Sequence, residues 1–455
     1  MTLSNNHVAI IGGGCAGLSA AAALVDRGYA VTIFEASSQL GGRTRTVVVE
    51  NNNLMHQLDN GQHILLGAYR ETLALLRKAG VDEKQVFLRV PLQLTMQAHT
   101  AKSVFSLKSK HYLPAPLNML FGLLGCQGLS FTDRIAATKL MVRLRRSHYQ
   151  IANDTPLEQF LINQQQSSHL LQMLWEPLCL AALNTPITIA STRIFLNILR
   201  DTFTGNKQNS DFLLPRQDLS QIIVYPLSRY IQEKGGVIRL NKRIRSLTVT
   251  IDKLGKEGFN LETRNENYYF KHVVLAVSPA RVDLFLASLP KLQRAYEQTQ
   301  RYTYQPIYTI YLQYSAETKL PDVMTGMTKM PSQSNITAQW VFDRGQLCGQ
   351  KGLIAVIVSA EGKHQKLTHD ALALKVAREL SDAFPDLAKP LWHKVIAEKR
   401  ATFSCVTNLA RPTNKTAQPH LYLAGDYTYA DYPATIESAV RSGIACANLI
   451  INNSD

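Results

Sequence analysis

The sequence lacks paired cysteines and long hydrophobic runs, and both absences narrow the class of protein. The chain has 455 residues and six widely scattered cysteines, with no Cys-x-x-Cys pair. This argues against a zinc site, a dithiol redox centre and a disulfide scaffold, so we predict no metal site and a reducing, cytoplasmic environment. No run reaches the roughly 20 apolar residues that span a bilayer. The first apolar run leads directly into a glycine turn, so we expect no secretory signal.

Acidic residues are also scarce. There are 34 Asp and Glu against 49 Lys and Arg, which gives a formal net charge of +15. Such an excess suggests an anionic partner. Nucleic acid is one candidate, but no recognised nucleic-acid motif accompanies the charge, so we expect no nucleic-acid partner. The other candidate is an anionic membrane surface.

A glycine-rich turn near the start of the chain is its most informative feature. The apolar stretch 7–11 is followed by Gly12, Gly14 and Gly17 in a GxGxxG pattern. In such a turn the first glycine permits the tight bend, the second lets backbone N–H groups approach a pyrophosphate, and the third allows close packing of helix on strand. The pattern therefore predicts dinucleotide binding.

The residues around the turn strengthen this prediction. A helix starting at Cys15 and Ala16 presents unpaired N–H groups to the phosphates. We interpret Cys15 as a small residue of the turn rather than an activated thiol. The next apolar strand, 31–34, ends at Glu35, which is placed to accept hydrogen bonds from a ribose.

Two more turns suggest cofactor contacts. Gly42 and Arg43 can place amides and a guanidinium beside the pyrophosphate. Gly425 and Asp426 close an apolar strand, where the carboxylate can bind a ribityl hydroxyl, and a helix from about Ala434 can point its N-terminus at a flavin ring oxygen. A solvated surface turn for Arg43 and a turn cap for Asp426 remain open. A single dinucleotide fingerprint favours one flavin, with the second substrate in a separate cavity.

These turns together resemble those of the amine oxidase and phytoene desaturase group of FAD flavoproteins. Five runs look more closely like the squalene-associated FAD-dependent desaturases, now called hydroxysqualene dehydroxylases; they are 58–69, 175–179, 190–196, 425–428 and 433–437. The resemblance covers nearly the whole chain. It implies non-covalent FAD and the reductive removal of a hydroxyl group from hydroxysqualene, a C30 isoprenoid, to give squalene for hopanoid synthesis.

The same resemblance implies an α/β fold of the amine oxidase type, in which an α+β substrate domain is inserted into a Rossmann-type FAD-binding domain. We expect the FAD-binding domain to comprise 1–91, 212–280 and 395–455, and the substrate domain 92–211 and 281–394. Helical patterns are expected at 131–146, 156–164, 168–183, 191–202 and 368–383. Further cofactor contacts implied by the resemblance are Gly61, Gln62, His63, Ile244, Thr435 and Ile436.

The implied reaction needs a dry cavity and a proton donor. Water would trap a carbocation, and an allylic alcohol leaves poorly until it is protonated. A hydride from reduced flavin would then be transferred to the allylic cation. Our first candidate for the general acid is His63, followed by Tyr308, Tyr432 and Glu176. A cofactor-packing role for His63 and a helix-cap role for Glu176 remain open.

Tyr308 also bears on the choice within the group. Amine oxidases commonly carry a lysine on the strand under the flavin N5, and our alignment places Tyr308 there, subject to a slip of one residue. This disfavours an amine oxidase. The alternative to dehydroxylation is a carotenoid-type desaturase or an amine oxidase, in which hydride flows from the substrate to FAD. Trp175, Tyr308 and Tyr432 are further expected to line an apolar tunnel and to stabilise positive charge.

Residues 113–146 form a possible membrane-docking segment. The apolar run 117–125 is too short to span a bilayer but suits an interfacial helix. Basic residues without an intervening acid follow it, at Lys139, Arg143, Arg145 and Arg146. We therefore expect peripheral association with the inner face of the cytoplasmic membrane. The alternative is a buried helix with a solvated basic face. The sequence does not indicate the electron donor.

Overall fold

The computed structural model describes residues 6–51, 54–98, 103–110, 112–252, 255, 257–328 and 336–452. Its first layer is a five-stranded parallel sheet in the order β10-β2-β1-β14-β20. The strands are β10 (Val237–Arg239), β2 (Ala30–Phe34), β1 (His7–Ile11), β14 (His272–Leu275) and β20 (Leu421–Leu423). Apart from His7 and His272, the residues of strands β1, β14 and β20 are apolar, because helices or a second sheet cover both faces of the sheet.

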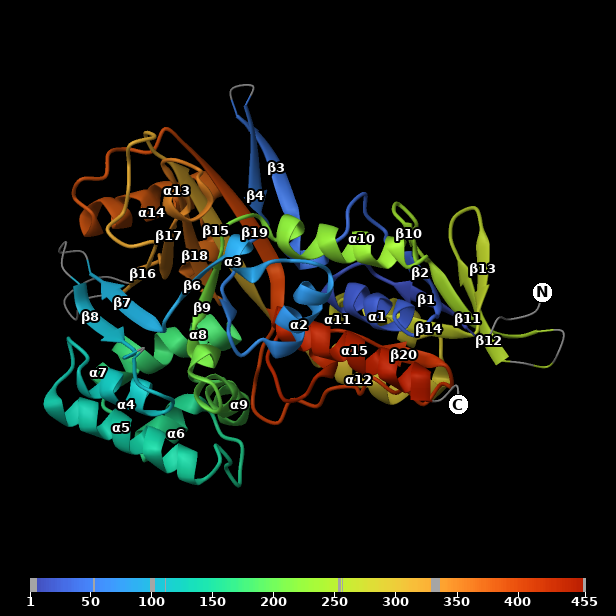
Figure 1. Cartoon of the computed structure of the whole chain (residues 1–455), viewed down its shortest axis with the longest axis horizontal. Coiled ribbons are helices and arrows are strands. Elements are labelled where there is room, and N and C mark those ends of the chain that lie inside the picture. Colours follow the sequence, from blue (N-terminus) through green and yellow to red (C-terminus); the bar gives the residue numbers. More distant parts are fainter. Residues whose placement is uncertain are drawn as a thin grey trace.

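Both faces of this sheet are covered. On one face lie α1 (Cys15–Val25), α2 (Arg70–Lys78), α10 (Tyr225–Glu233) and α15 (Ile436–Asn452). On the other lie the antiparallel strands β11 (Ser246–Ile251), β12 (Glu257–Glu262) and β13 (Asn267–Phe270), with α11 (Pro279–Leu286) and then α12 (Gln293–Gln300). We call this unit the Rossmann lobe. It occupies the right of Figure 1, where both chain ends lie.

The second unit, which we call the insert lobe, is built on a seven-stranded sheet in the order β19-β15-β18-β17-β16-β7-β8. The strands are β19 (Trp392–Phe403), β15 (Tyr304–Gln313), β18 (Leu353–Ser359), β17 (Trp340–Asp343), β16 (Met324–Met327), β7 (Gln93–Gln97) and β8 (Ser103–Lys108). β16 and β7 pair in parallel, and the other neighbours pair antiparallel.

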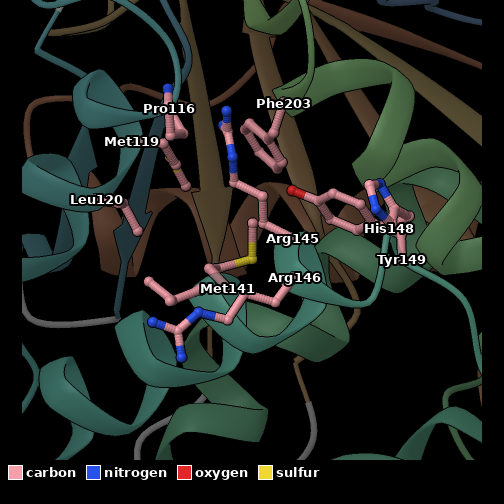
Figure 2. A pocket seen from close by; sticks show the side chains of 10 residues that line it. Pro116, Met119, Leu120, Met141, Arg145, Arg146, His148, Tyr149 and Phe203 are labelled. Carbon is pink, nitrogen blue, oxygen red and sulfur yellow. The ribbon is translucent and has the colours of Figure 1, made fainter.

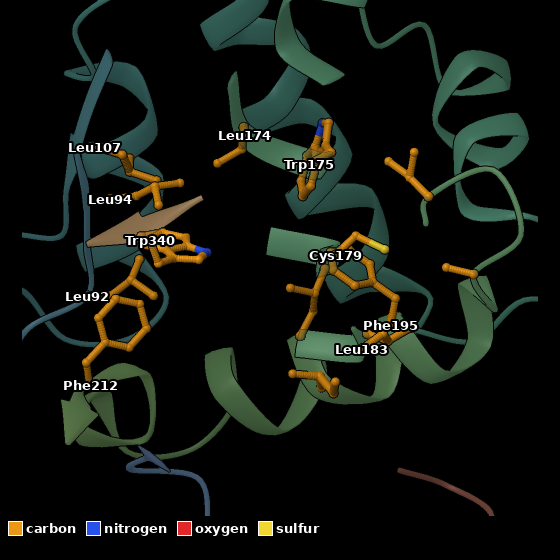
Figure 3. Close-up of a cluster of buried hydrophobic side chains, with 14 of the residues drawn as sticks. Leu92, Leu94, Leu107, Leu174, Trp175, Cys179, Leu183, Phe195, Phe212 and Trp340 are labelled. Atoms are coloured by element: carbon orange, nitrogen blue, oxygen red, sulfur yellow. The ribbon is translucent and has the colours of Figure 1, made fainter. Parts of the chain in front are cut away.

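Helices cover both faces of this sheet as well. One face packs against α14 (His369–Ala383). The other packs against a helical layer made of α4 (Leu117–Leu124), α5 (Phe131–Arg146), α6 (Leu157–Asn163), α7 (Ser168–Leu170), α8 (Glu176–Leu183) and α9 (Thr192–Phe203). Figure 3 shows this core, with Trp340 and Leu94 on the sheet side and Trp175 and Phe195 on the helix side.

Short elements join the two lobes. The hairpin of β3 (Thr46–Asn51) and β4 (Leu54–Asp59) leads into the segment that carries His63. A small sheet follows, made of β5 (Leu65–Leu66), β6 (Phe87–Val90) and β9 (Phe212–Pro215), with α3 (Glu83–Val86) before β6. Helix α13 (Arg344–Cys348) connects β17 to β18 and packs beside β9.

The predicted fold class is confirmed, and most of the predicted helices lie within a residue or two of their expected positions. The pattern at 168–183 is helical throughout but contains a π-helical turn at Leu171–Trp175. The boundary expected at residue 395 falls inside β19, which pairs with β15 along the insert-lobe sheet as far as Phe403. No helix in the described ranges is long and apolar enough to cross a membrane.

Candidate active site

The three glycines of the first turn have different surroundings. Gly12 has a φ of +112°, and a Cβ there would lie 2.5 Å from the Ala276 carbonyl oxygen. A Cβ on Gly17 would lie 2.0 Å from the Gly12 carbonyl oxygen. A Cβ on Gly14 would meet no atom within 4 Å, so the space beside Gly14 is open. This is the arrangement a pyrophosphate needs, because the backbone is tightly packed on one side and accessible on the other.

The N-terminus of α1 has no side-chain cap. The N–H groups of Cys15 and Ala16 in its first turn are therefore free of side-chain acceptors, and they point their partial positive charge out of the helix. The Cys15 side chain is buried, and burial raises the pKa of its thiol above the ordinary value. The helix N-terminus thus offers an anion site without creating a reactive thiolate.

Arg43, near the N-terminus of the chain, contacts two residues near its C-terminus. Its Nη2 lies 2.6 Å from the Asp426 carboxylate, 383 positions away, and its Nη1 donates to the Ala401 carbonyl oxygen at 2.6 Å. Gly42, the residue before Arg43, lies against the first turn, since its added Cβ would be 3.5 Å from the Gly14 Cα. The solvated-turn interpretation of Arg43 is thereby excluded, because the guanidinium is held by two buried acceptors.

Glu35 lies where the other end of a dinucleotide would be. Its carboxylate accepts the Gly13 N–H and the Ser37 N–H, both at 2.8 Å. The backbone of Lys242 donates to the Glu35 carbonyl oxygen at 2.9 Å, which brings the following loop alongside. Ile244 of that loop is buried in the core between the parallel sheet and β11–β13. Glu35 and Ile244 are therefore both placed at the carboxyl edge of β2.

The C-terminal turn is anchored by helix α15. The Gly425 N–H donates to Ser442 Oγ at 2.9 Å. Thr435 Oγ1 accepts the Ser438 N–H at 3.2 Å and so caps the helix, which begins at Ile436. These contacts fasten the turn that carries Asp426 to α15, and Asp426 in turn pairs with Arg43.

Sequence reasoning missed Glu437, which fastens this turn to α2. Glu437 is fully buried, and its carboxylate accepts the N–H groups of Glu71 at 3.1 Å and Thr72 at 2.9 Å. It also accepts Arg441 Nε at 2.8 Å. A buried carboxylate on the N-terminus of α2 is favoured by the helix dipole. Nothing in the sequence marked this contact, because its partners are more than 360 positions apart.

His63 lies at the centre of the site. Its Nδ1 is buried without a hydrogen-bond partner among the described residues. Loss of solvation lowers the pKa of His63 to about 4, and the positive charge of Arg43 adds to this, against a hydrogen bond with the Gly61 backbone. Thr309 Oγ1 is also buried and unpartnered. Both residues face Gly61, whose added Cβ would lie 3.6 Å from Thr309 Oγ1 and 3.8 Å from His63 Cε1.

The placement of Tyr308 corrects our expectation. Tyr308 packs against α14, with its ring 5.0 Å from that of His364. Successive side chains of a strand point to opposite faces. Residues 309 and 311 of β15 therefore face the segment that carries His63, and Tyr308 faces away. Thr309, one residue along, is the side chain of β15 that lies beside Gly61.

Tyr432 and Glu176 are not placed as free acids beside His63. The Tyr432 hydroxyl donates to the Asp201 carboxylate, and burial together with this bond raises the pKa of Tyr432. Glu176 begins α8 and is exposed to solvent, which a donor in a dry cavity is not. Trp175 is buried in the helical core and donates from Nε1 to Gln166 at 3.0 Å.

Gln62 belongs to a buried polar network that the sequence did not suggest. Its Oε1 accepts Arg344 Nη1 at 2.5 Å, and the same nitrogen lies 3.4 Å from the Asp59 carboxylate. Arg344 and Asp59 have side chains only 2% and 3% exposed. Burial raises the pKa of Asp59 to about 6, although the charge of Arg344 opposes this. The network connects α13 of the insert lobe to the segment that holds His63.

The residues present fit a flavin dinucleotide. The α1 N-terminus is uncapped beside the open space at Gly14, and the unpartnered His63 and Thr309 atoms lie farther along, past Arg43. A pyrophosphate would accept hydrogen bonds from the N-terminus of α1. The polar edge of an isoalloxazine ring would supply hydrogen-bond partners for His63 and Thr309. The fold and this site define an FAD-dependent oxidoreductase.

Comparison with known proteins agrees. The model of the family described as flavin containing amine oxidoreductase matches residues 15–451, so the chain belongs to that family. It is similar to the hydroxysqualene dehydroxylases of Rhodopseudomonas palustris (27% identity over 98% of both chains) and Zymomonas mobilis (25% identity over 98% of this chain and 99% of that one). The resemblance predicted from the sequence is therefore confirmed.

A solved structure shows the same fold. That of a putative protoporphyrinogen oxidase from Exiguobacterium aligns with a TM-score of 0.68 at 16% identity, covering 99% of this chain and 100% of that one. At this identity the likeness concerns the fold alone.

Proposed function

We propose that the protein catalyses the FAD-dependent reductive dehydroxylation of hydroxysqualene to squalene in hopanoid or squalene biosynthesis. The similarity to hydroxysqualene dehydroxylases along nearly the whole chain supports the substrate. The observation that carries the chemistry is the desolvated His63, which has an unpartnered nitrogen beside the cofactor turns.

The reaction needs one proton and one hydride. Protonation of the allylic hydroxyl breaks the C–O bond and releases water, and the hydride forms the new C–H bond. Bound FAD, once reduced, supplies the hydride and its two electrons. The chain's own residues must deliver the proton to the hydroxyl oxygen, exclude water and orient the substrate.

His63 is the proton donor of this proposal. Its pKa of about 4 makes the imidazolium a strong acid, scarcely populated at neutral pH. Thr309 Oγ1 has no partner among the described residues and can accept or donate a hydrogen bond to the same hydroxyl group. Arg344 is a positioning residue in this proposal, because it donates a hydrogen bond to the side-chain amide of Gln62, the residue next to His63.

Anaerobic incubation of the dithionite-reduced protein with hydroxysqualene tests the proposal. We expect flavin reoxidation together with one squalene formed per FAD. Reoxidation without squalene would contradict the proposal. Reduction of the oxidised protein by a polyene or an amine would instead identify a carotenoid-type desaturase or an amine oxidase.

We further propose that the protein docks on the inner face of the cytoplasmic membrane, where a C30 isoprenoid is dissolved. Leu117, Phe121 and Leu124 are 43%, 50% and 38% exposed and share one face of α4. Phe131, at the start of α5, is 71% exposed. We call these four residues the docking face. An apolar face followed by basic residues is suited to an anionic lipid surface.

A further inference from the structure

We propose that a pocket between α4, α5 and α9 binds a single anionic phospholipid, with its phosphate at Arg145 and Arg146 and an acyl chain along the apolar wall. The proposal extends the membrane-docking part of the proposed function and is independent of the reaction. The pocket has a volume of about 430 Å³, which is within the range of small-molecule sites but smaller than a whole lipid. The glycerol and part of one chain would occupy it.

One wall of the pocket is apolar. Met119 of α4, Met141 of α5 and Phe203 of α9 line it, and all three are buried. Figure 2 shows the Met141 sulfur near the centre of the group, with Phe203 above it and Met119 to one side. Flexible methionine side chains suit a mobile hydrocarbon chain.

The pocket also presents a hydroxyl group beside its apolar wall. Tyr149 lines the pocket, and the residue as a whole is only 5% exposed. Figure 2 shows this hydroxyl pointing inward from the wall. A hydroxyl group at this position can donate a hydrogen bond to a phosphate or ester oxygen of a lipid.

The backbone is strained where it places Tyr149. His148 and Tyr149 have φ values of 53° and 60°, two successive non-glycine residues in the left-handed region. Each such residue costs of order 1 kcal/mol and persists only when its surroundings impose it. The strain turns the Tyr149 ring into the pocket instead of continuing α5.

The charge on the pocket is of one sign. Arg145 and Arg146 line it, and neither pairs with a carboxylate in the described ranges. No acidic residue lines the pocket. Two unpaired guanidinium groups beside an apolar wall match a phosphate joined to a hydrocarbon chain. A neutral isoprenoid alcohol would leave both charges unmatched, so the substrate itself is the poorer occupant.

The position of the pocket relates it to the docking face. Leu120 lines the pocket, while Leu117, Phe121 and Leu124 of the same helix α4 are exposed. A lipid in the bilayer surface contacted by the docking face would therefore reach the pocket without leaving the membrane.

The test uses the FAD-loaded protein and dihexanoylphosphatidylglycerol below its micelle concentration, with binding measured by calorimetry. We expect one lipid per chain, binding of dihexanoylphosphatidylcholine at least tenfold weaker, and no binding of inorganic phosphate. Arg145→Gln with Arg146→Gln should weaken binding roughly tenfold or more. Tyr149→Phe should weaken it several-fold. Met141→Trp should abolish it by filling the pocket without a change in charge.

The matched control is Arg193→Gln with Arg229→Gln, two exposed arginines outside the pocket. It changes the net charge equally and should leave lipid binding as it is. Equal affinity for the two lipids, or equal loss in the two double variants, would overturn the proposal. Squalene formation in detergent is measured separately, so failure of the reaction and failure of lipid binding are distinguishable.

Discussion

At the scale of single residues, burial decides the chemistry of the site. His63 loses solvation, lies near the Arg43 charge, and is therefore neutral at physiological pH. Burial shifts the pKa of Cys15 upward instead, because the charged form of a thiol is the deprotonated one. The thiol pKa is raised even though Cys15 lies at a helix N-terminus. Neither effect is visible in the residue types. Both follow from what surrounds the side chain after folding.

The His63 proposal predicts a pH dependence. Above a pKa of about 4, the protonated fraction of His63 falls tenfold per pH unit, so log kcat should fall with a slope near −1 between pH 6 and pH 8. His63→Asn should lower kcat by about 10²-fold or more and remove the slope. Stopped-flow single turnovers measure both. His364→Asn, on the other face of β15, is the control and should keep the slope. A sloping profile in His63→Asn would remove His63 from the mechanism.

The buried Arg344 network predicts a coupling energy. Arg344→Met leaves the Asp59 carboxylate buried without its counter-charge, so we expect the free energy of unfolding to fall by about 3–5 kcal/mol. Adding Asp59→Asn should restore part of this loss, and a urea-based double-mutant cycle measures the coupling. At the exposed pair Lys242–Glu266, Lys242→Met should have a much smaller effect on the free energy of unfolding, because solvent screens this pair. Strictly additive effects of Arg344→Met and Asp59→Asn would contradict the network.

At the scale of elements, the hydrophobic periodicity of the sequence shows which face of a helix or strand is buried when only one face is covered. When both faces are covered, the periodicity does not show which face points toward the site. The alternation of β15 separates Thr309 and Tyr311, which face the His63 segment, from Tyr308 and Ile310, which face α14. All of these side chains are buried, so the sequence pattern did not reveal which set faces the site. Helix α4 is the opposite case: apart from Asn118 its residues are apolar, and yet the helix leaves one apolar face exposed to solvent.

The docking face predicts the binding of vesicles. Leu117→Asp, Phe121→Asp and Leu124→Asp together should reduce co-sedimentation with phosphatidylglycerol vesicles at least tenfold, because apolar area is lost and negative charge is added. The control replaces three exposed leucines elsewhere, Leu284, Leu374 and Leu391, with Asp. It adds the same charge and should retain binding. An equal loss of vesicle binding in both triple variants would show that binding depends on net charge alone, and it would contradict the docking face.

At the scale of the whole molecule, buried neutral histidines connect stability to pH. His272 lies in the interior strand β14 of the parallel sheet, and both of its ring nitrogens are buried without partners in the described ranges. Burial lowers the pKa of His272 to about 3, with smaller effects from His420 and Lys271. The unfolded chain takes up this proton near pH 6.5, so the folded state loses stability as the pH falls from there toward 3.

A variant isolates this effect. The free energy of unfolding should decrease between pH 7 and pH 4 in both proteins. The decrease should be smaller in His272→Leu than in the native protein, by up to about 3 kcal/mol. Urea denaturation at both pH values measures the difference. His369→Leu, at an exposed position, is the control and should resemble the native protein. An unchanged pH dependence in His272→Leu would show that another group takes up the proton.

The sequence by itself determined the Rossmann turn, the acid at the end of β2, the cofactor class and the general fold, because these depend on local patterns of glycine and apolar residues. Only the tertiary structure decided which side of β15 faces His63, that Arg43 pairs with Asp426, and that Arg344 and Glu437 hold the site together. These are contacts between residues hundreds of positions apart, and local propensity carries no information about them. They form because buried charges must find partners in the folded chain.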